Sequence, residues 1–105
     1  MRWYQLVAHF FGGMFFVNGI PHFVSGVCGR KFPSPFASPP GKGLSSAMVN
    51  VLWGALNIGI GYWLVWHVGI FDLRSAREVA VAGVGGLLMG VMLARTFSQE
   101  SVKRD

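Results

Sequence analysis

Three long stretches without a charged residue divide the chain, and their pattern of apolar positions predicts its architecture. With Asp, Glu, Lys and Arg taken as breaks, the stretches cover residues 3–29, 43–71 and 79–94 and are 27, 29 and 16 residues long. About 20 apolar residues span a bilayer, so the first two are long enough to cross it. The third is long enough if Glu78 and Arg95 lie at the two interfaces. The sequence therefore predicts three transmembrane helices.

These stretches predict a single all-α membrane domain with the following boundaries. The helices cover about residues 3–28, 45–71 and 75–97, with a basic, proline-rich loop at 29–44 and a polar tail at 98–105. Consecutive spans run antiparallel, so the first two helices form a hairpin. Ser45 or Ser46 is a suitable N-cap for the second helix, and Pro21 predicts a kink in the first.

Composition supports a lipid environment. Only 12% of the residues are charged and 52% are hydrophobic, whereas soluble domains carry about twice this share of charge. The net charge of +5 does not indicate nucleic-acid binding, because the basic residues lie in short segments between apolar stretches and form no continuous basic face. Cys28 is the only cysteine, which excludes an intramolecular disulfide framework.

Polar residues in the first two stretches predict contacts between the first two helices. In an antiparallel hairpin, residues at equal depth have numbers with a nearly constant sum. That sum is 72 for His22 and Asn50, and 75 for Asn18 and Asn57. We call these four residues the polar seam. Buried amide and imidazole groups need partners in lipid, so the seam indicates interhelical hydrogen bonding or, alternatively, a ligand site or ion path.

His9 and His67 form a further pair at similar depth, with a sum of 76. Imidazole nitrogens bind transition metals and haem iron, so these two residues are candidate ligands for a metal or one haem near an interface. The alternative is that each imidazole is a hydrogen-bonded structural residue, in which case no cofactor is expected.

Small residues recur every four positions in the third helix. We call this set the small-residue stripe; it comprises Ala82, Gly86, Gly90 and Ala94. Small side chains let helix backbones approach closely in lipid, where van der Waals contact is a main source of association. The stripe therefore predicts a helix-packing interface, either within one chain or with another chain.

Basic residues predict the orientation. With three spans, the 29–44 loop and the C-terminal tail share one side, which carries six basic residues against three on the other. Because cytoplasmic loops carry an excess of Lys and Arg, we expect a cytoplasmic C-terminus and an N-terminus outside. The residues expected to contact lipid headgroups are Arg30, Lys31, Lys42 and Arg95.

Several motifs resemble a family of small multi-pass bacterial membrane proteins that have no assigned activity. The resemblance covers about two thirds of the chain and rests on Asn18-Gly19-Ile20-Pro21-His22-Phe23, Phe32-Pro33-Ser34-Pro35-Phe36, Pro40-Gly41 and Asn50-x-x-Trp53-Gly54-x-x-Asn57. It implies a location in the bacterial inner membrane.

Known catalytic motifs are absent from the sequence, so we expect no enzymatic activity. Three small helices bury little surface against one another, which favours a structural or accessory subunit, in a homo-oligomer or a larger membrane complex. One alternative is a minimal transporter or channel that uses the polar seam. A second is a haem- or metal-binding redox subunit that uses His9 and His67.

Overall fold

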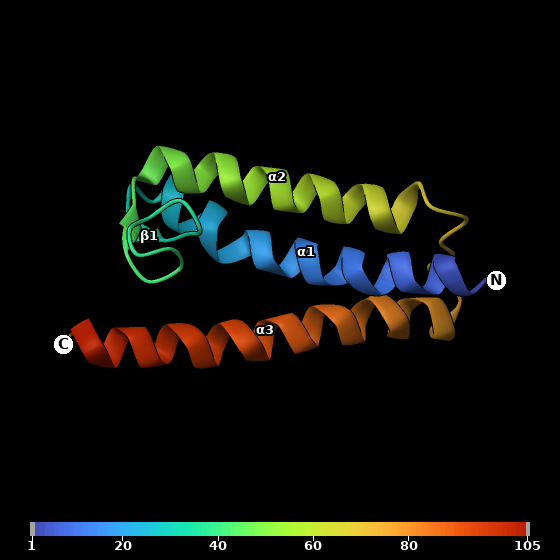
Figure 1. Cartoon of the computed structure of the whole chain (residues 1–105). Helices are drawn as coiled ribbons and strands as arrows, with labels where there is room; N and C mark the ends of the chain where they lie inside the picture. Colours follow the sequence, from blue (N-terminus) through green and yellow to red (C-terminus); the bar gives the residue numbers. More distant parts are fainter. Residues whose placement is uncertain (1, 105) are drawn as a thin grey trace.

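Three long helices make up most of the protein, as Figure 1 shows for the computed structural model. The structure describes the backbone of residues 2–104 and the side chains of residues 2–99. Helix α1 is Trp3–Val27, α2 is Ala47–Trp66 and α3 is Ala76–Arg104. Each is long and apolar enough to cross a membrane. The prediction of an all-α protein with three transmembrane helices is confirmed.

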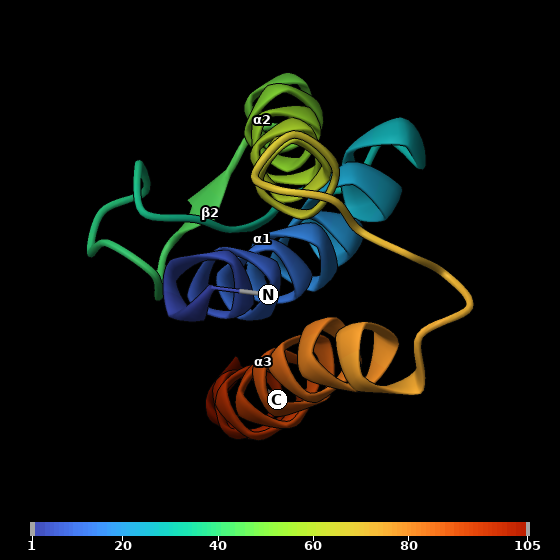
Figure 2. The same cartoon turned by 90° about the vertical axis from the view of Figure 1, so that its right-hand side faces the viewer.

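The three helices form an open arrangement with α1 in the middle. Helices α2 and α3 pack on opposite sides of α1 (Figures 1 and 2). Because the helices alternate in direction, the N- and C-termini lie at opposite ends of the molecule. The protein measures 46 × 24 × 21 Å, so its long axis matches the thickness of a bilayer with its headgroups, about 40–45 Å.

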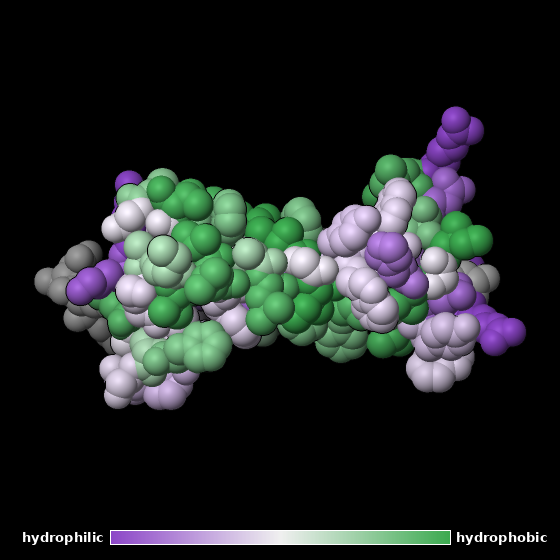
Figure 3. Space-filling model, turned by 90° about the horizontal axis from the view of Figure 1, so that it is seen from above, coloured by the Kyte–Doolittle hydropathy of each residue, from purple (hydrophilic) through white to green (hydrophobic). Residues whose placement is uncertain are grey.

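Burial is inverted relative to a water-soluble protein. The fully buried side chains include His9 and Asn50, both 0% exposed, whereas Ala37 is the one hydrophobic residue classed as buried in the described part of the chain. Large apolar side chains cover the outside, and on the face in Figure 3 hydrophilic residues gather toward the two ends. Exposed apolar surface on this scale is stable only where hydrocarbon surrounds it.

Helix α1 ends at Val27, close to the predicted end near residue 28. Gly29 has a φ of +74°, a left-handed conformation that glycine adopts without steric cost. The amides of Gly29 and Arg30 donate to the carbonyls of Gly26 and Ser25, which completes a Schellman motif.

The segment between α1 and α2 is more ordered than the expected loop. Two short strands, β1 (Phe32–Pro33) and β2 (Leu44–Ser45), pair antiparallel, with Phe32 opposite Ser45. The hydroxyls of Ser34 and Ser45 share a buried hydrogen bond that holds the two sides of the segment together. Spacing in the sequence could not predict a pairing that depends on a side-chain contact across the loop.

Helix α2 begins as predicted and ends earlier than predicted. The Ser46 hydroxyl accepts a hydrogen bond from the Val49 amide, which confirms Ser46 as the N-cap. The helix stops at Trp66, so the predicted end near residue 71 is wrong. Gly69 has a φ of +69°, and residues 67–75 form a linker that runs past one side of α1 from α2 to α3 (Figure 2). The first residues of the linker are uncharged but not helical, and two of them, Val68 and Phe71, contact His9 of α1.

Helix α3 is longer than predicted. Ser75 caps its start by accepting from the Glu78 amide. The helix continues to Arg104, so the predicted helix end near residue 97 is wrong and the polar segment up to residue 104 is helical; residue 105 lies outside the described residues. The segment after Phe97 contains no glycine or proline to end a helix, and polarity alone does not stop one.

Candidate functional site

His22 and Asn50 form the centre of the polar seam. His22 Nδ1 lies 2.9 Å from Asn50 Oδ1. An amide oxygen only accepts hydrogen bonds, so His22 donates through Nδ1. Asn50 Nδ2 faces three carbonyl oxygens, those of Phe32 at 3.0 Å, Ser46 at 3.0 Å and Ser45 at 3.3 Å. One buried amide therefore links α1, α2 and the short sheet.

The second pair of the seam lies about one to two helical turns away. Asn18 Nδ2 donates to Asn57 Oδ1 over 2.9 Å, and Asn57 Nδ2 donates to the Trp53 carbonyl over 2.8 Å. Asn57 is 1% exposed and Asn18 is half-buried. Asn50 and Asn57 thus use the same arrangement, in which the amide nitrogen bonds a carbonyl four residues earlier and the oxygen faces α1. Both pairs inferred from residue numbering are in hydrogen-bond contact.

Glycines surround the seam and bring the two helix backbones together, a contact that was not among the predictions from the sequence. Gly12, Gly19 and Gly26 recur every seven residues in α1 and face three small residues of α2, Gly61, Gly54 and Ala47. A Cβ atom on Gly19 would lie 2.5 Å from the Gly54 carbonyl oxygen, closer than real Cβ atoms come. The seven-residue spacing and the constant sum of 73 for facing positions were present in the sequence and could have revealed this contact.

His9 and His67 have separate partners. His9 is fully buried, and its Nε2 lies 2.9 Å from the Val68 carbonyl oxygen, to which it donates. The His9 ring also packs edge-on against Phe71, with ring centroids 5.2 Å apart. His67 is exposed, and its ring lies beside Tyr62.

The sequence placed His67 at the depth of His9, and the observed partner is the next residue, Val68. The contact is with the Val68 backbone carbonyl and not with the His67 ring. Within the described residues, no three His, Cys, Asp or Glu side chains group together in a way that could hold a metal ion. His9 Nδ1 is buried and has no hydrogen-bond partner. His9 therefore joins α1 to the linker through Val68 and Phe71.

The small-residue stripe packs mainly within the chain. Ala82 and Gly86 face Gly13 of α1, and a Cβ atom on Gly86 would lie 2.9 Å from Val17 Cγ2. The Cβ position of Gly90 is 3.8 Å from Val17 Cγ1, whereas Ala94 is exposed. The sequence left open whether the stripe packs within one chain or against another chain. Ala82, Gly86 and Gly90 pack within the chain. Gly85, which the stripe did not include, is buried against the Phe10 carbonyl.

The four expected headgroup residues are exposed. Arg30, Lys31 and Lys42 lie on the segment between α1 and α2, and Arg95 lies on the part of α3 that runs toward the same end of the molecule (Figure 1). Lys103 and Arg104, which the orientation argument also used, have side chains outside the described residues.

Comparison with known proteins adds no relative. No protein-family model, curated protein or solved structure matches this chain.

Proposed function

We propose that this chain is a non-catalytic, structural or accessory membrane protein that acts by associating with other transmembrane helices, in the simplest case with a second copy of itself. The observation that carries the proposal concerns Gly59. A Cβ atom built on Gly59 has no neighbouring atom within 4 Å, although this glycine lies in the middle of α2.

Gly59 differs in this respect from the other glycines of α1 and α2, both of which the structure describes throughout. Each of the others contacts a neighbouring helix, and a Cβ atom there would come within 3.0 Å of it. Ala55 lies one turn before Gly59 on the same exposed side of α2. Two small residues four positions apart let a second helix approach the backbone closely. A self-complementary contact between two such faces would give a closed dimer.

The polar seam supports a structural role more than a pathway. The hydrogen bonds of its four side chains run to one another and to nearby backbone carbonyls. A ligand site or ion path needs polar groups that face a space. Three surface hollows lie on the described part of the chain, and none of the four seam residues lines them.

The proposal includes an orientation and a location. The segment between α1 and α2 and the C-terminal end of α3 would face the cytoplasm, because they carry the larger share of basic residues. The N-terminus would lie outside. The location would be the inner membrane of a bacterium, as the family resemblance implies.

The oligomeric state in a bilayer tests the association. Wild-type protein and Gly59→Leu would be labelled with one dye per chain, reconstituted in liposomes at a series of dilutions, and analysed by single-molecule photobleaching. We expect wild type to bleach in more than one step and Gly59→Leu to bleach mainly in one. Gly83→Leu is the matched control, since Gly83 is an exposed glycine of α3 that also has open space around its Cβ position.

Two results would contradict the proposal. Wild type could bleach in one step at every dilution, or the Gly59 and Gly83 variants could give the same distribution. The transport alternative has its own readout, because vesicles that contain wild type would then leak protons or monovalent cations, and Asn57→Leu would abolish the leak.

A further inference from the structure

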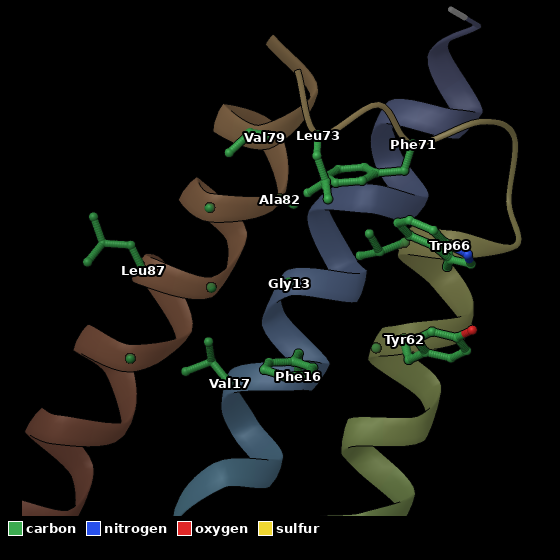
Figure 4. Close-up of a pocket in the computed structure, with 15 residues that line it drawn as sticks. Gly13, Phe16, Val17, Tyr62, Trp66, Phe71, Leu73, Val79, Ala82 and Leu87 are labelled. Carbon is green, nitrogen blue, oxygen red and sulfur yellow. The ribbon is translucent and has the colours of Figure 1, made fainter. Parts of the chain in front are cut away.

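The open arrangement of the helices leaves an apolar groove between α2 and α3. Helix α1 forms its floor, through Gly13, Phe16 and Val17 (Figure 4). The groove has a volume of about 660 Å³. Its α2 wall includes Tyr62 and Trp66, and its α3 wall includes Gly83 and Leu87.

The chemistry of the groove limits what can fill it. Apart from the Tyr62 hydroxyl and the Trp66 indole nitrogen, its lining side chains carry no polar atom. These two polar atoms offer ordered water too few partners, and an empty apolar groove would lack dispersion contacts along its walls. The occupant must therefore be hydrocarbon, either a lipid chain or the apolar side of another helix.

The extent of the groove along the membrane distinguishes these two occupants. On α3 its lining runs from Val79 to Gly90, which at 1.5 Å per residue is about 16 Å. One leaflet of the hydrocarbon core is about 15 Å thick, half of roughly 30 Å. Beyond Gly90, α2 no longer contributes, and the next hollow is lined by α1 and α3 alone. The groove thus fits a chain from one leaflet, whereas a transmembrane helix needs a surface that crosses both.

Side chains at the linker end of the groove also favour a lipid as the occupant. Phe71 and Leu73 of the linker lie at this end in Figure 4, and the next basic residues along the chain, Arg74 and Arg77, are exposed. Arginine binds phosphate oxygens through paired hydrogen bonds. The nearby Asp72 and Glu78 carboxylates accept from the backbone amides of Arg74 and Asp72. Tyr62 and Trp66 are residue types that favour the headgroup level of a bilayer.

We infer that the groove binds one acyl chain of an anionic phospholipid from the leaflet at the linker end, with its phosphate held by Arg74 and Arg77. The inference does not depend on the proposed association through Gly59, which lies outside the groove lining. The protein would therefore carry a specific lipid whether or not it forms oligomers.

Photo-cross-linking tests the inference. Full-length protein would be reconstituted in nanodiscs of phosphatidylcholine with a small fraction of phosphatidylglycerol that carries a diazirine in its acyl chain. After irradiation, mass spectrometry would map the labelled peptides. We expect label on groove residues of α3 and α2, reduced at least fivefold in Gly83→Leu, whose side chain would enter the open groove. Gly59→Leu is the control and should label like wild type.

A second measurement separates the chain from the headgroup. The double variant Arg74→Gln/Arg77→Gln should keep its groove labelling by a phosphatidylcholine that carries the same diazirine. It should lose about fivefold of its preference for phosphatidylglycerol over phosphatidylcholine for each arginine removed. If Gly83→Leu alters the circular dichroism spectrum, Leu87→Trp replaces it as the variant that fills the groove.

Some outcomes would overturn the inference. Equal groove labelling in wild type and a folded groove-filling variant would do so, as would equal labelling by phosphatidylcholine and phosphatidylglycerol probes. A change of oligomeric state in Gly83→Leu, with none in Gly59→Leu, would mean that a second copy occupies the groove. This change of oligomeric state would also contradict the proposed role of Gly59. Absence of lipid labelling in the groove would overturn the inference about lipid but leave the proposed role of Gly59 intact.

Discussion

His22 Nδ1 lies 2.9 Å from Asn50 Oδ1, and the amide nitrogen of the same asparagine lies 3.0 Å from the Phe32 carbonyl oxygen. Asn50 therefore connects α1 to α2 and both helices to the short sheet. In hydrocarbon these groups have no water to replace a lost partner, so the cluster fixes the geometry of one end of the molecule.

Replacing Asn50 should destabilise the protein more than replacing Asn57. Asn50→Leu leaves the buried His22 N–H and the Phe32 carbonyl without partners, which we expect to lower the free energy of unfolding by about 2–3 kcal/mol. Asn57→Leu removes one interhelical bond and should cost about 0.6–1.7 kcal/mol. Steric trapping in bicelles would measure both. Equal losses would show that Asn50 stabilises the structure no more than Asn57 does.

The close approach of α1 and α2 should make Gly54 sensitive to a single methyl group. A Cβ atom at this position would lie 2.5 Å from the Phe23 backbone nitrogen. We expect Gly54→Ala to reduce stability by about 1–3 kcal/mol through overpacking. Gly83→Ala, where the new atom enters open space, should change stability by less than about 0.5 kcal/mol. A Gly54→Ala variant as stable as wild type would mean that the helices can separate without loss.

His9 should control the order of the 67–75 linker. His9→Leu removes the hydrogen bond to the Val68 carbonyl, so the linker amides should exchange with solvent at least tenfold faster while those of α2 stay protected. Hydrogen exchange with mass spectrometry would measure this. His67→Leu is the matched control, because His67 is exposed and should leave the exchange of the linker unchanged. The same acceleration in both variants would argue against a specific role of His9.

The contact between α1 and α3 should depend on Gly86. A Cβ atom on Gly90 lies 3.8 Å from Val17 Cγ1, so cysteines at positions 17 and 90 should cross-link within one chain when Cys28 is replaced by serine. We expect Gly86→Leu, which inserts a large side chain against Val17, to reduce this cross-link severalfold on denaturing gels. A cross-link that forms between chains, or one that Gly86→Leu does not affect, would contradict the intramolecular packing of the stripe.

Cysteine accessibility should report the proposed orientation. Cys28 is exposed at the end of α1, and Leu73 is 70% exposed on the linker at the opposite end. In intact spheroplasts, a membrane-impermeant maleimide should label Leu73→Cys in a Cys28→Ser background and leave wild-type Cys28 unlabelled. Inverted vesicles should give the reverse. The opposite labelling pattern would invert the proposed topology.

The sequence by itself determined the number of spans and the depth of the polar residues. Three uncharged stretches gave the number of helices but not the ends of α2 and α3, and the constant sum of residue numbers paired His22 with Asn50 and Asn18 with Asn57. Both inferences succeed because the rise per residue and the antiparallel direction of two helices set the depth of each residue in the membrane. This depth does not depend on how the side chains pack.

Only the tertiary structure decided which helix lies in the middle, where the small-residue stripe packs and how the linker folds. Apolar residues at the end of α2 look alike in sequence whether they continue a helix or, as Val68 and Phe71 do, fold back on His9. Lipid tails are as apolar as the side chains, so hydropathy does not select neighbours among helices. Close backbone contacts between residues distant in sequence make that selection, and they exist only once the helices are assembled.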